Sequence, residues 1–261
     1  TLGNLPKLEY LYLSDNRLTG TLPAALSQLR EVTSMLVQGN RLHGNLHHVF
    51  NHTVQRRLTT IQFSNNMFTG TLPEEMFRLP KLTTVVMVSN CLRGTLPANV
   101  CTPAKLETLV LDGLHSASSC KGFTIPGFNV AAQQSRYFSG AVPPCLFNMP
   151  HLNTLHLSGN SLSGGLPKDL VVNDRLVDLD LSHNVLSGEI PPAIQTKTWY
   201  NLALSYNRFR GNLRHDFFSE ERNLSFTLTS EHVEVVITNI TYPSSASALN
   251  LENNRLSGVL P

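Results

Sequence analysis

Apolar residues recur along the chain in one fixed pattern, with polar residues between them. The pattern is clearest over residues 176–191, where it reads L-x-x-L-x-L-x-x-N-x-L-x-G-x-I-P, and it returns over residues 152–167, 82–97, 58–73 and 8–23. A phrase repeating every ~24 residues predicts a solenoid, in which each turn buries its apolar side chains against its neighbours. Within L-x-L the leucines alternate with period two, which predicts a short strand with one apolar face and one polar face.

The asparagine of the phrase marks the register of each turn. It is present at Asn16, Asn40, Asn66, Asn90, Asn160, Asn184, Asn207 and Asn254, and it is replaced at Leu114, Arg136 and Glu231. These positions predict about eleven turns in a single array over residues 1–261. An asparagine amide both donates and accepts hydrogen bonds, so we expect it to satisfy backbone groups of neighbouring turns where the strand bends away.

The phrase degrades in two regions. Residues 112–143 are predicted to form either one irregular turn or a loop that projects from the solenoid, and residues 214–243 a degenerate turn. Within the second region, the run over residues 233–237 could form an extra strand on the side or back.

The four cysteines surround the first irregular region. Three pairings are open, and we favour Cys91 with Cys120 and Cys101 with Cys145, because these bonds would staple turns where the phrase fails. Three sequons place candidate glycosylation sites at Asn51, Asn223 and Asn239. Disulfides and sequons together predict an extracellular or cell-surface location; the alternative is a cytosolic chain with chance sequons and four inert thiols.

The charge and hydropathy of the chain disfavour some classes of partner. Lysine and arginine number 20 against 18 aspartate and glutamate, which disfavours a nucleic-acid partner. No apolar stretch approaches the ~18 residues of a membrane span. Both ends fall inside repeats and show no polar cap, so we expect the sequence to be a fragment of a longer protein.

With its fixed letters written out, the phrase resembles that of the plant-type leucine-rich repeat family. That family includes receptor-kinase ectodomains, receptor-like proteins and polygalacturonase inhibitors, and algal and other protist proteins carry similar repeats. The resemblance implies right-handed coils with a concave parallel β-sheet, and 3₁₀ turns and loops on the convex side. The chain departs from the family in its cysteines, which lie in the middle of the array, and in the missing cysteine-paired caps.

The candidate binding residues are strand positions that face away from the core. Two groups stand out, the apolar Leu36, Val86, Val88 and Val110, and the titratable Asp112, His156, Asp178 and Asp180. An apolar surface bordered by charge is typical of a protein or peptide site. The alternative is that valine and threonine simply suit exposed strands.

The sequence gives little support for a catalytic site. His47, His48 and His52 lie close in sequence without a neighbouring cysteine or carboxylate, so we expect a solvated surface and no metal. Asp180 and His183 should point to different sides of their strand, with no nucleophile to activate. We therefore predict a protein that is not an enzyme and needs no cofactor.

The leading hypothesis is a non-catalytic extracellular scaffold that binds a protein or peptide, with polysaccharide as a further candidate partner. The alternative is a structural repeat protein of a matrix, cell wall or filament, and enzyme inhibition is a third class. Ice binding is suggested by a threonine column over Thr60, Thr84, Thr108 and Thr154, but the column breaks at Val130 and ends at Asp178.

Overall fold

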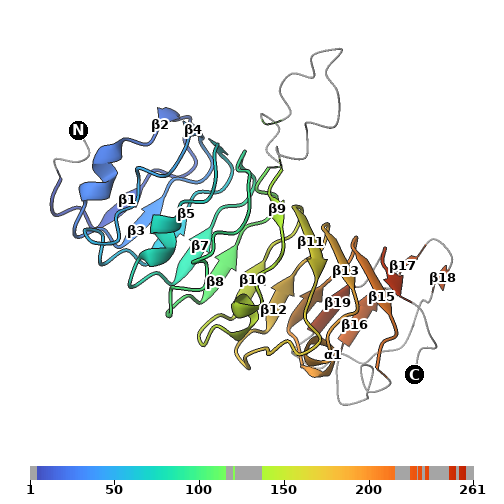
Figure 1. The fold of residues 1–261 in the computed structure, drawn as a ribbon. Helices are drawn as coiled ribbons and strands as arrows, with labels where there is room; N and C mark the ends of the chain where they lie inside the picture. Colours follow the sequence, from blue (N-terminus) through green and yellow to red (C-terminus); the bar gives the residue numbers. More distant parts are fainter. Residues whose placement is uncertain are drawn as a thin grey trace, which may run out of the picture.

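The protein coils into an arc of stacked turns, with the strands of successive turns side by side (Figure 1). The structure is a computed structural model that describes residues 5–115, 120, 137–214, 224–227, 229–230, 233–234, 247–250 and 253–256. It has the solenoid architecture expected from the repeat.

The concave side is a ten-stranded parallel sheet. Its strands, in spatial order, are β1 (Tyr10–Tyr12), β3 (Ser34–Leu36), β5 (Thr60–Gln62), β7 (Thr84–Val86), β8 (Thr108–Val110), β10 (Thr154–His156), β12 (Asp178–Asp180), β14 (Asn201–Ala203), β19 (Ser247–Asn250) and β16 (Leu224–Thr227). From β1 to β14 the middle residue of each strand is buried and its two neighbours are half-buried or exposed, as the period-two pattern predicts.

Further strands follow the asparagine corner of each turn. A three-stranded sheet contains β2 (Thr19–Thr21), β4 (Arg41–Gly44) and β6 (Met67–Phe68), and a five-stranded sheet contains β9 (Ser139–Gly140), β11 (Ser161–Gly165), β13 (Val185–Gly188), β15 (Arg208–Gly211) and β20 (Arg255–Leu256). β17 (Thr229–Ser230) and β18 (Val233–Glu234) form an antiparallel pair. The predicted extra strand thus appears at residues 233–234, whereas residues 235–237 lie outside the described part.

Short helices follow the proline of several turns. They are the 3₁₀ helices η2 (Ala24–Gln28), η3 (Glu74–Arg78) and η7 (Pro144–Asn148), and the α-helix α1 (Pro192–Thr196). Each presents apolar residues such as Leu26, Met76 and Ile194 to one core that runs through the described turns. Trp199 is 2% exposed and occupies a core position, with its Nε1 donating to the Ile194 carbonyl at 2.9 Å.

Buried asparagines tie each turn to the one before it. Asn66 donates from Nδ2 to the Val37 carbonyl (2.9 Å) and accepts at Oδ1 from the Leu42 amide (3.0 Å). Asn90, Asn184 and Asn207 make equivalent bonds to their own preceding turns. Because these amides replace water for backbone groups at the corner, each asparagine fixes which turns are neighbours.

The strands on either side of the first irregular region are direct neighbours in the sheet. β8 pairs directly with β10, and Asn160 bonds across to Leu111 (2.9 Å) and Leu114 (3.0 Å). Phe138 then bridges Gly94, so the second half of the phrase resumes at residue 138. Of the two alternatives, the pairing favours a loop, since the described sheet leaves no place for a turn registered on Arg136.

Two disulfides join residues in and around the first irregular region. Cys91 is bonded to Cys120 and Cys101 to Cys145, the pairing that we favoured from the sequence. Residues 116–119 and 121–136, which include the replaced register mark at Arg136, lie outside the described part.

The second irregular region changes the strand order. β14 pairs with β19, and Asn254 donates to the Leu204 carbonyl (2.9 Å), so the turn of Asn254 follows directly on that of Asn207. β16 lies on the outer side of β19, although it precedes β19 in the sequence. Counting register marks predicts a turn at Glu231 between those of Asn207 and Asn254, but no described strand lies between β14 and β19. Neighbours in sequence are therefore not always neighbours in space. The boundaries at residues 112–143 and 214–243 stay predictions.

Candidate functional site

The register of the concave sheet brings most of the predicted binding residues together. Val86 pairs with Val110, Val110 with His156, and His156 with Asp180, in one row across β7, β8, β10 and β12. All four side chains are half-buried. The row therefore passes from an apolar surface to a charged one over four adjacent strands.

Of the remaining predicted residues, three lie beside this row and one does not. Val88 and Asp112 follow β7 and β8, and Asp178 begins β12, so all three lie beside the row. Leu36 does not join the group, because Gln62 lies between it and Val86 and its other neighbour is Tyr12. We call Val86, Val88 and Val110 the valine patch, and Asp112, His156, Asp178 and Asp180 the aspartate–histidine cluster.

Within the cluster, His156 lies between two carboxylates. Its Nε2 is 2.8 Å from Oδ1 of Asp178, and its Nδ1 is 3.9 Å from Oδ2 of Asp112. Asn201 donates from Nδ2 to the same Asp178 oxygen at 2.9 Å, which fixes that carboxylate from the next strand. Three carboxylates around one histidine leave the cluster negative at neutral pH.

Backbone amides hold the other two carboxylates. Oδ1 of Asp112 accepts from the Ser158 amide at 2.7 Å, and Oδ1 of Asp180 accepts from the Ser182 amide at 2.8 Å. Among the residues that the structure describes, no group of three histidines, cysteines or carboxylates could hold a metal ion. The geometry suits hydrogen bonding and charge recognition at a surface.

Burial raises the pKa of the Asp112 carboxyl. Desolvation raises the pKa of its carboxyl from 3.8 to about 6, and the charges of Asp180 and Asp178 act in the same direction. The Ser158 amide and His156 act in the opposite direction but do not offset burial. The folded state therefore favours the protonated form of Asp112.

This shift predicts a pH-dependent stability. The pKa of Asp112 is raised in the fold to about 6, so the free energy of unfolding should fall as the pH rises from about 4 to about 6. Asp112→Asn keeps an acceptor for Ser158 and should remove this dependence, raising stability at pH 7 by on the order of 1 kcal/mol. Thermal unfolding of the wild type and the variant at about pH 4 and at pH 7 measures the effect.

The matched control is Asp169→Asn, which changes an exposed aspartate outside the concave sheet. It should leave the pH dependence as in the wild type. An Asp112→Asn variant with the wild-type pH dependence would contradict the assigned cause.

Sequence reasoning missed the residue that precedes each asparagine. At this corner Asp15, Asn65, Ser89, His183, Tyr206 and Asn253 all have φ between 52° and 55°, and Gly39, Gly113 and Gly159 are also left-handed. The prevalence of Gly, Asn and Asp there was the available signal. His183 and Tyr206 do not fit it; their rings stack at 4.1 Å on the exposed corner.

The predicted histidine surface has separate partners. His47 Nε2 contacts Thr71 Oγ1 (3.0 Å), His48 Nε2 contacts the Leu22 carbonyl (2.8 Å), and His52 Nδ1 contacts Glu75 Oε2 (2.5 Å). Sequence reasoning did not place a carboxylate near these histidines, since Glu75 comes from the next turn. Because the three rings engage different groups, they do not converge on one ligand.

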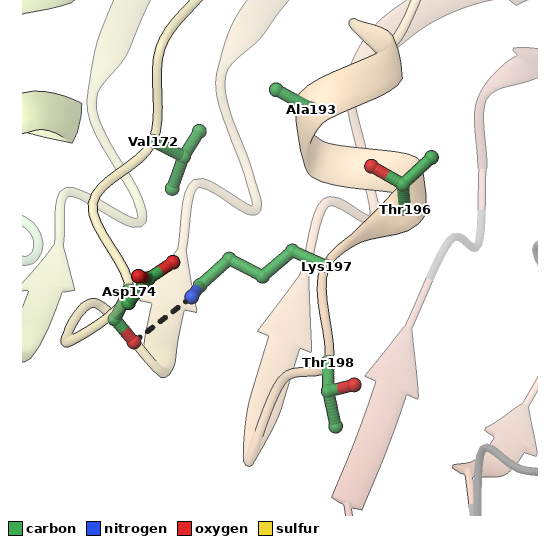
Figure 2. Close-up of a pocket in the computed structure, with 6 residues that line it drawn as sticks. All are labelled: Val172, Asp174, Ala193, Thr196, Lys197 and Thr198. Carbon is green, nitrogen blue, oxygen red and sulfur yellow. Dashed lines mark hydrogen bonds between the residues drawn. The ribbon is translucent and has the colours of Figure 1, made fainter.

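A pocket of about 530 Å³ lies outside the concave sheet, between α1 and the segment that precedes β12 (Figure 2). Its rim is crossed by Lys197, whose Nζ donates to the Asp174 carbonyl at 3.0 Å. Burial lowers the pKa of Lys197 below its usual value. The ammonium also lies 5.6 Å from the centre of the Trp199 ring, so it is engaged in holding two turns together.

Two sequence models, both of the family described as leucine rich repeat, match the chain. One covers residues 1–42, and the other covers residues 57–79, 151–172 and 175–196. Receptor-like protein 39 of Arabidopsis thaliana is 32% identical over 158 residues, which are 59% of this chain and 15% of that protein. The chain carries leucine-rich repeats and is similar to plant receptor-like proteins over part of its length.

Other relatives of this leucine-rich repeat protein agree. Receptor-like protein 32 of Arabidopsis thaliana is 38% identical over 73 residues, which are 28% of this chain and 8% of that protein. The ectodomain of the Arabidopsis thaliana receptor kinase GASSHO1/SCHENGEN3, solved with CASPARIAN STRIP INTEGRITY FACTOR 2, superposes with a TM-score of 0.71 at 27% identity. That match covers 100% of this chain and 26% of the ectodomain.

The leucine-rich repeat protein thus spans a small part of the length of each of these relatives. Within the described residues, no helix has the length and apolar character needed to cross a membrane.

Proposed function

We propose that this leucine-rich repeat protein is part of an extracellular or cell-surface receptor-like protein that binds a peptide or protein segment on its concave face. The site is the valine patch together with the aspartate–histidine cluster. The observation that carries the proposal is the row Val86, Val110, His156 and Asp180, which the sheet register makes continuous across four strands.

The chemistry of the row favours a segment with an apolar and a cationic part. The valine patch offers apolar area for a side chain to cover, and the three carboxylates beside it favour a lysine, an arginine or a terminal amine. A parallel sheet fixed by buried asparagines does not need to rearrange on binding, which lowers the entropic cost of association. The receptor kinase ectodomain noted above was solved with a bound factor, which supports the same class of partner.

The other predicted roles remain open to direct tests. A matrix or filament protein should polymerise, an enzyme inhibitor should inhibit a polygalacturonase, and an ice-binding protein should change the shape of ice crystals. The break that we predicted at Val130 is wrong, because Thr60, Thr84, Thr108 and Thr154 are consecutive register partners in the sheet. The threonine column still ends at Asp178, whose carboxylate contacts His156, so peptide recognition stays the leading proposal.

Asn51 is the proposed glycan acceptor within the described residues. It is half-exposed, and its Oδ1 accepts from the Thr53 hydroxyl of its own sequon at 2.7 Å. Asn223 and Asn239 lie outside the described residues, so glycosylation there stays a prediction from the sequence. Peptide mapping after glycosidase treatment of the secreted chain would show which sites carry a glycan.

Peptides selected against the wild-type chain from a random phage-displayed library should bind the double variant Val86→Asp/Val110→Asp at least about tenfold more weakly. Two new carboxylates would remove the apolar surface at the centre of the row and would be left desolvated on binding. The affinity of each synthesised peptide is measured by isothermal titration calorimetry.

The matched control is Val171→Asp. Val171 is 60% exposed and lies between β11 and β12, outside the concave sheet, so the same substitution should leave peptide affinity unchanged. Equal affinities for the wild type and the double variant, with both folded by circular dichroism, would refute binding at the valine patch.

A further inference from the structure

Three exposed arginines gather on the five-stranded sheet that follows the asparagine corners. Arg208 and Arg210 are exposed on β15, on either side of the buried Phe209, and Arg255 is exposed on β20. Arg210 and Arg255 are register partners on these neighbouring strands. The three side chains therefore share one face, although Arg255 comes 45 residues after Arg210 in the sequence.

Within the described part of the chain, no carboxylate forms an ion pair with any of these three arginines. The side chain of Glu189 lies against Gly211 at the end of β15, and its carboxylate pairs with Lys168 at 3.2 Å. Like charges on directly paired strand positions repel and destabilise a sheet. An anion bound between Arg210 and Arg255 would relieve this repulsion.

An aromatic surface lies at the corner that leads into β15. The rings of His183 and Tyr206 stack with centroids 4.1 Å apart and an interplanar angle of 11°. Tyr206 is 44% exposed and precedes Arg208 by two residues. Both residues hold a left-handed backbone that disfavours bulky side chains, so the corner carries strain that an asparagine or glycine would avoid.

We propose that Arg208, Arg210, Arg255, His183 and Tyr206 form a second binding surface, separate from the concave site, that takes an acidic polysaccharide. Guanidinium groups bind carboxylates through paired hydrogen bonds, which suits the uronate groups of such a chain. The exposed ring stack offers a flat apolar face on which a sugar ring can lie. An acidic protein would use the arginines alone, so the ring stack is the feature that favours a polysaccharide.

The test measures binding of the whole chain to soluble polygalacturonate, with polyglutamate as a probe of equal charge type but without sugar rings. The wild type should bind polygalacturonate more tightly than polyglutamate, and the affinity should fall as salt is raised. The triple variant Arg208→Gln/Arg210→Gln/Arg255→Gln should lose at least about tenfold in affinity for polygalacturonate.

The control variant Arg17→Gln/Arg41→Gln/Arg93→Gln removes the same formal charge from exposed arginines elsewhere in the array and should change the affinity by less than about twofold. Tyr206→Asn keeps a residue that tolerates the left-handed corner while removing the ring. It should remove the preference for polygalacturonate over polyglutamate.

Two outcomes would overturn the proposal. Equal losses in the two triple variants would show that binding follows net charge and not this surface. Polyglutamate binding as tight as polygalacturonate binding, and unaffected by Tyr206→Asn, would assign the surface to an acidic protein partner.

Discussion

Asn66→Ala should lower the free energy of unfolding by about 2–3 kcal/mol, because the substitution leaves the buried Leu42 amide without its acceptor and removes one of two donors to the Val37 carbonyl. Asn66 is 2% exposed, donates to the Val37 carbonyl at 2.9 Å and accepts from the Leu42 amide at 3.0 Å. The alanine methyl group replaces neither bond, and a buried corner gives water little access. Urea unfolding followed by circular dichroism measures the change in midpoint and slope.

Asn16→Ala provides a control at the equivalent position of another turn. Asn16 is exposed, and its Nδ2 donates only within its own turn, to the carbonyls of Leu13 (3.1 Å) and Ser14 (2.9 Å). Water can replace these bonds, so the expected loss is within about 0.5 kcal/mol. Equal losses at Asn16 and Asn66 would show that the asparagines do not act by satisfying buried backbone.

The double variant Cys101→Ala/Cys145→Ala should lower the free energy of unfolding by about 2–4 kcal/mol. The bond joins residues 44 apart in sequence, and its loss lets the unfolded chain sample many more conformations. The substitution also frees the segment after Leu96, which contains Cys101, from η7, which contains Cys145. The urea midpoint of the variant, compared with that of the wild type, measures the effect.

Unfolding the wild type under reducing conditions distinguishes two causes of the loss in stability. Reduction breaks the cross-link but keeps the two sulfur atoms, whereas the double variant removes both. Reduction breaks both disulfides, so it should destabilise the chain at least as much as the double variant does. If the variant is much less stable than the reduced wild type, the loss comes from packing around Cys101, which contacts the core. A variant with the wild-type midpoint would contradict the prediction.

The sequence predicted best those features that depend on residues within one turn. The leucines of L-x-L, the corner asparagine and the glycine of each turn act within one turn and on its immediate neighbour, so their spacing was enough to predict the solenoid and its concave strands. The same spacing led to the row of Val86, Val110 and His156, because these residues share one register position. Its weakness was the assumption that successive turns in sequence are adjacent in space.

The sequence by itself determined the period, the inward-facing core and the strand positions. It favoured the observed cysteine pairs but left three pairings open, and the structure decided between them. Only the tertiary structure decided that β10 pairs with β8 and β19 with β14, since a long loop can leave a turn and return to it at modest entropic cost. Those two pairings bring Asp112 to His156 and Arg210 to Arg255. Both proposed binding surfaces therefore depend on neighbours that local periodicity does not encode.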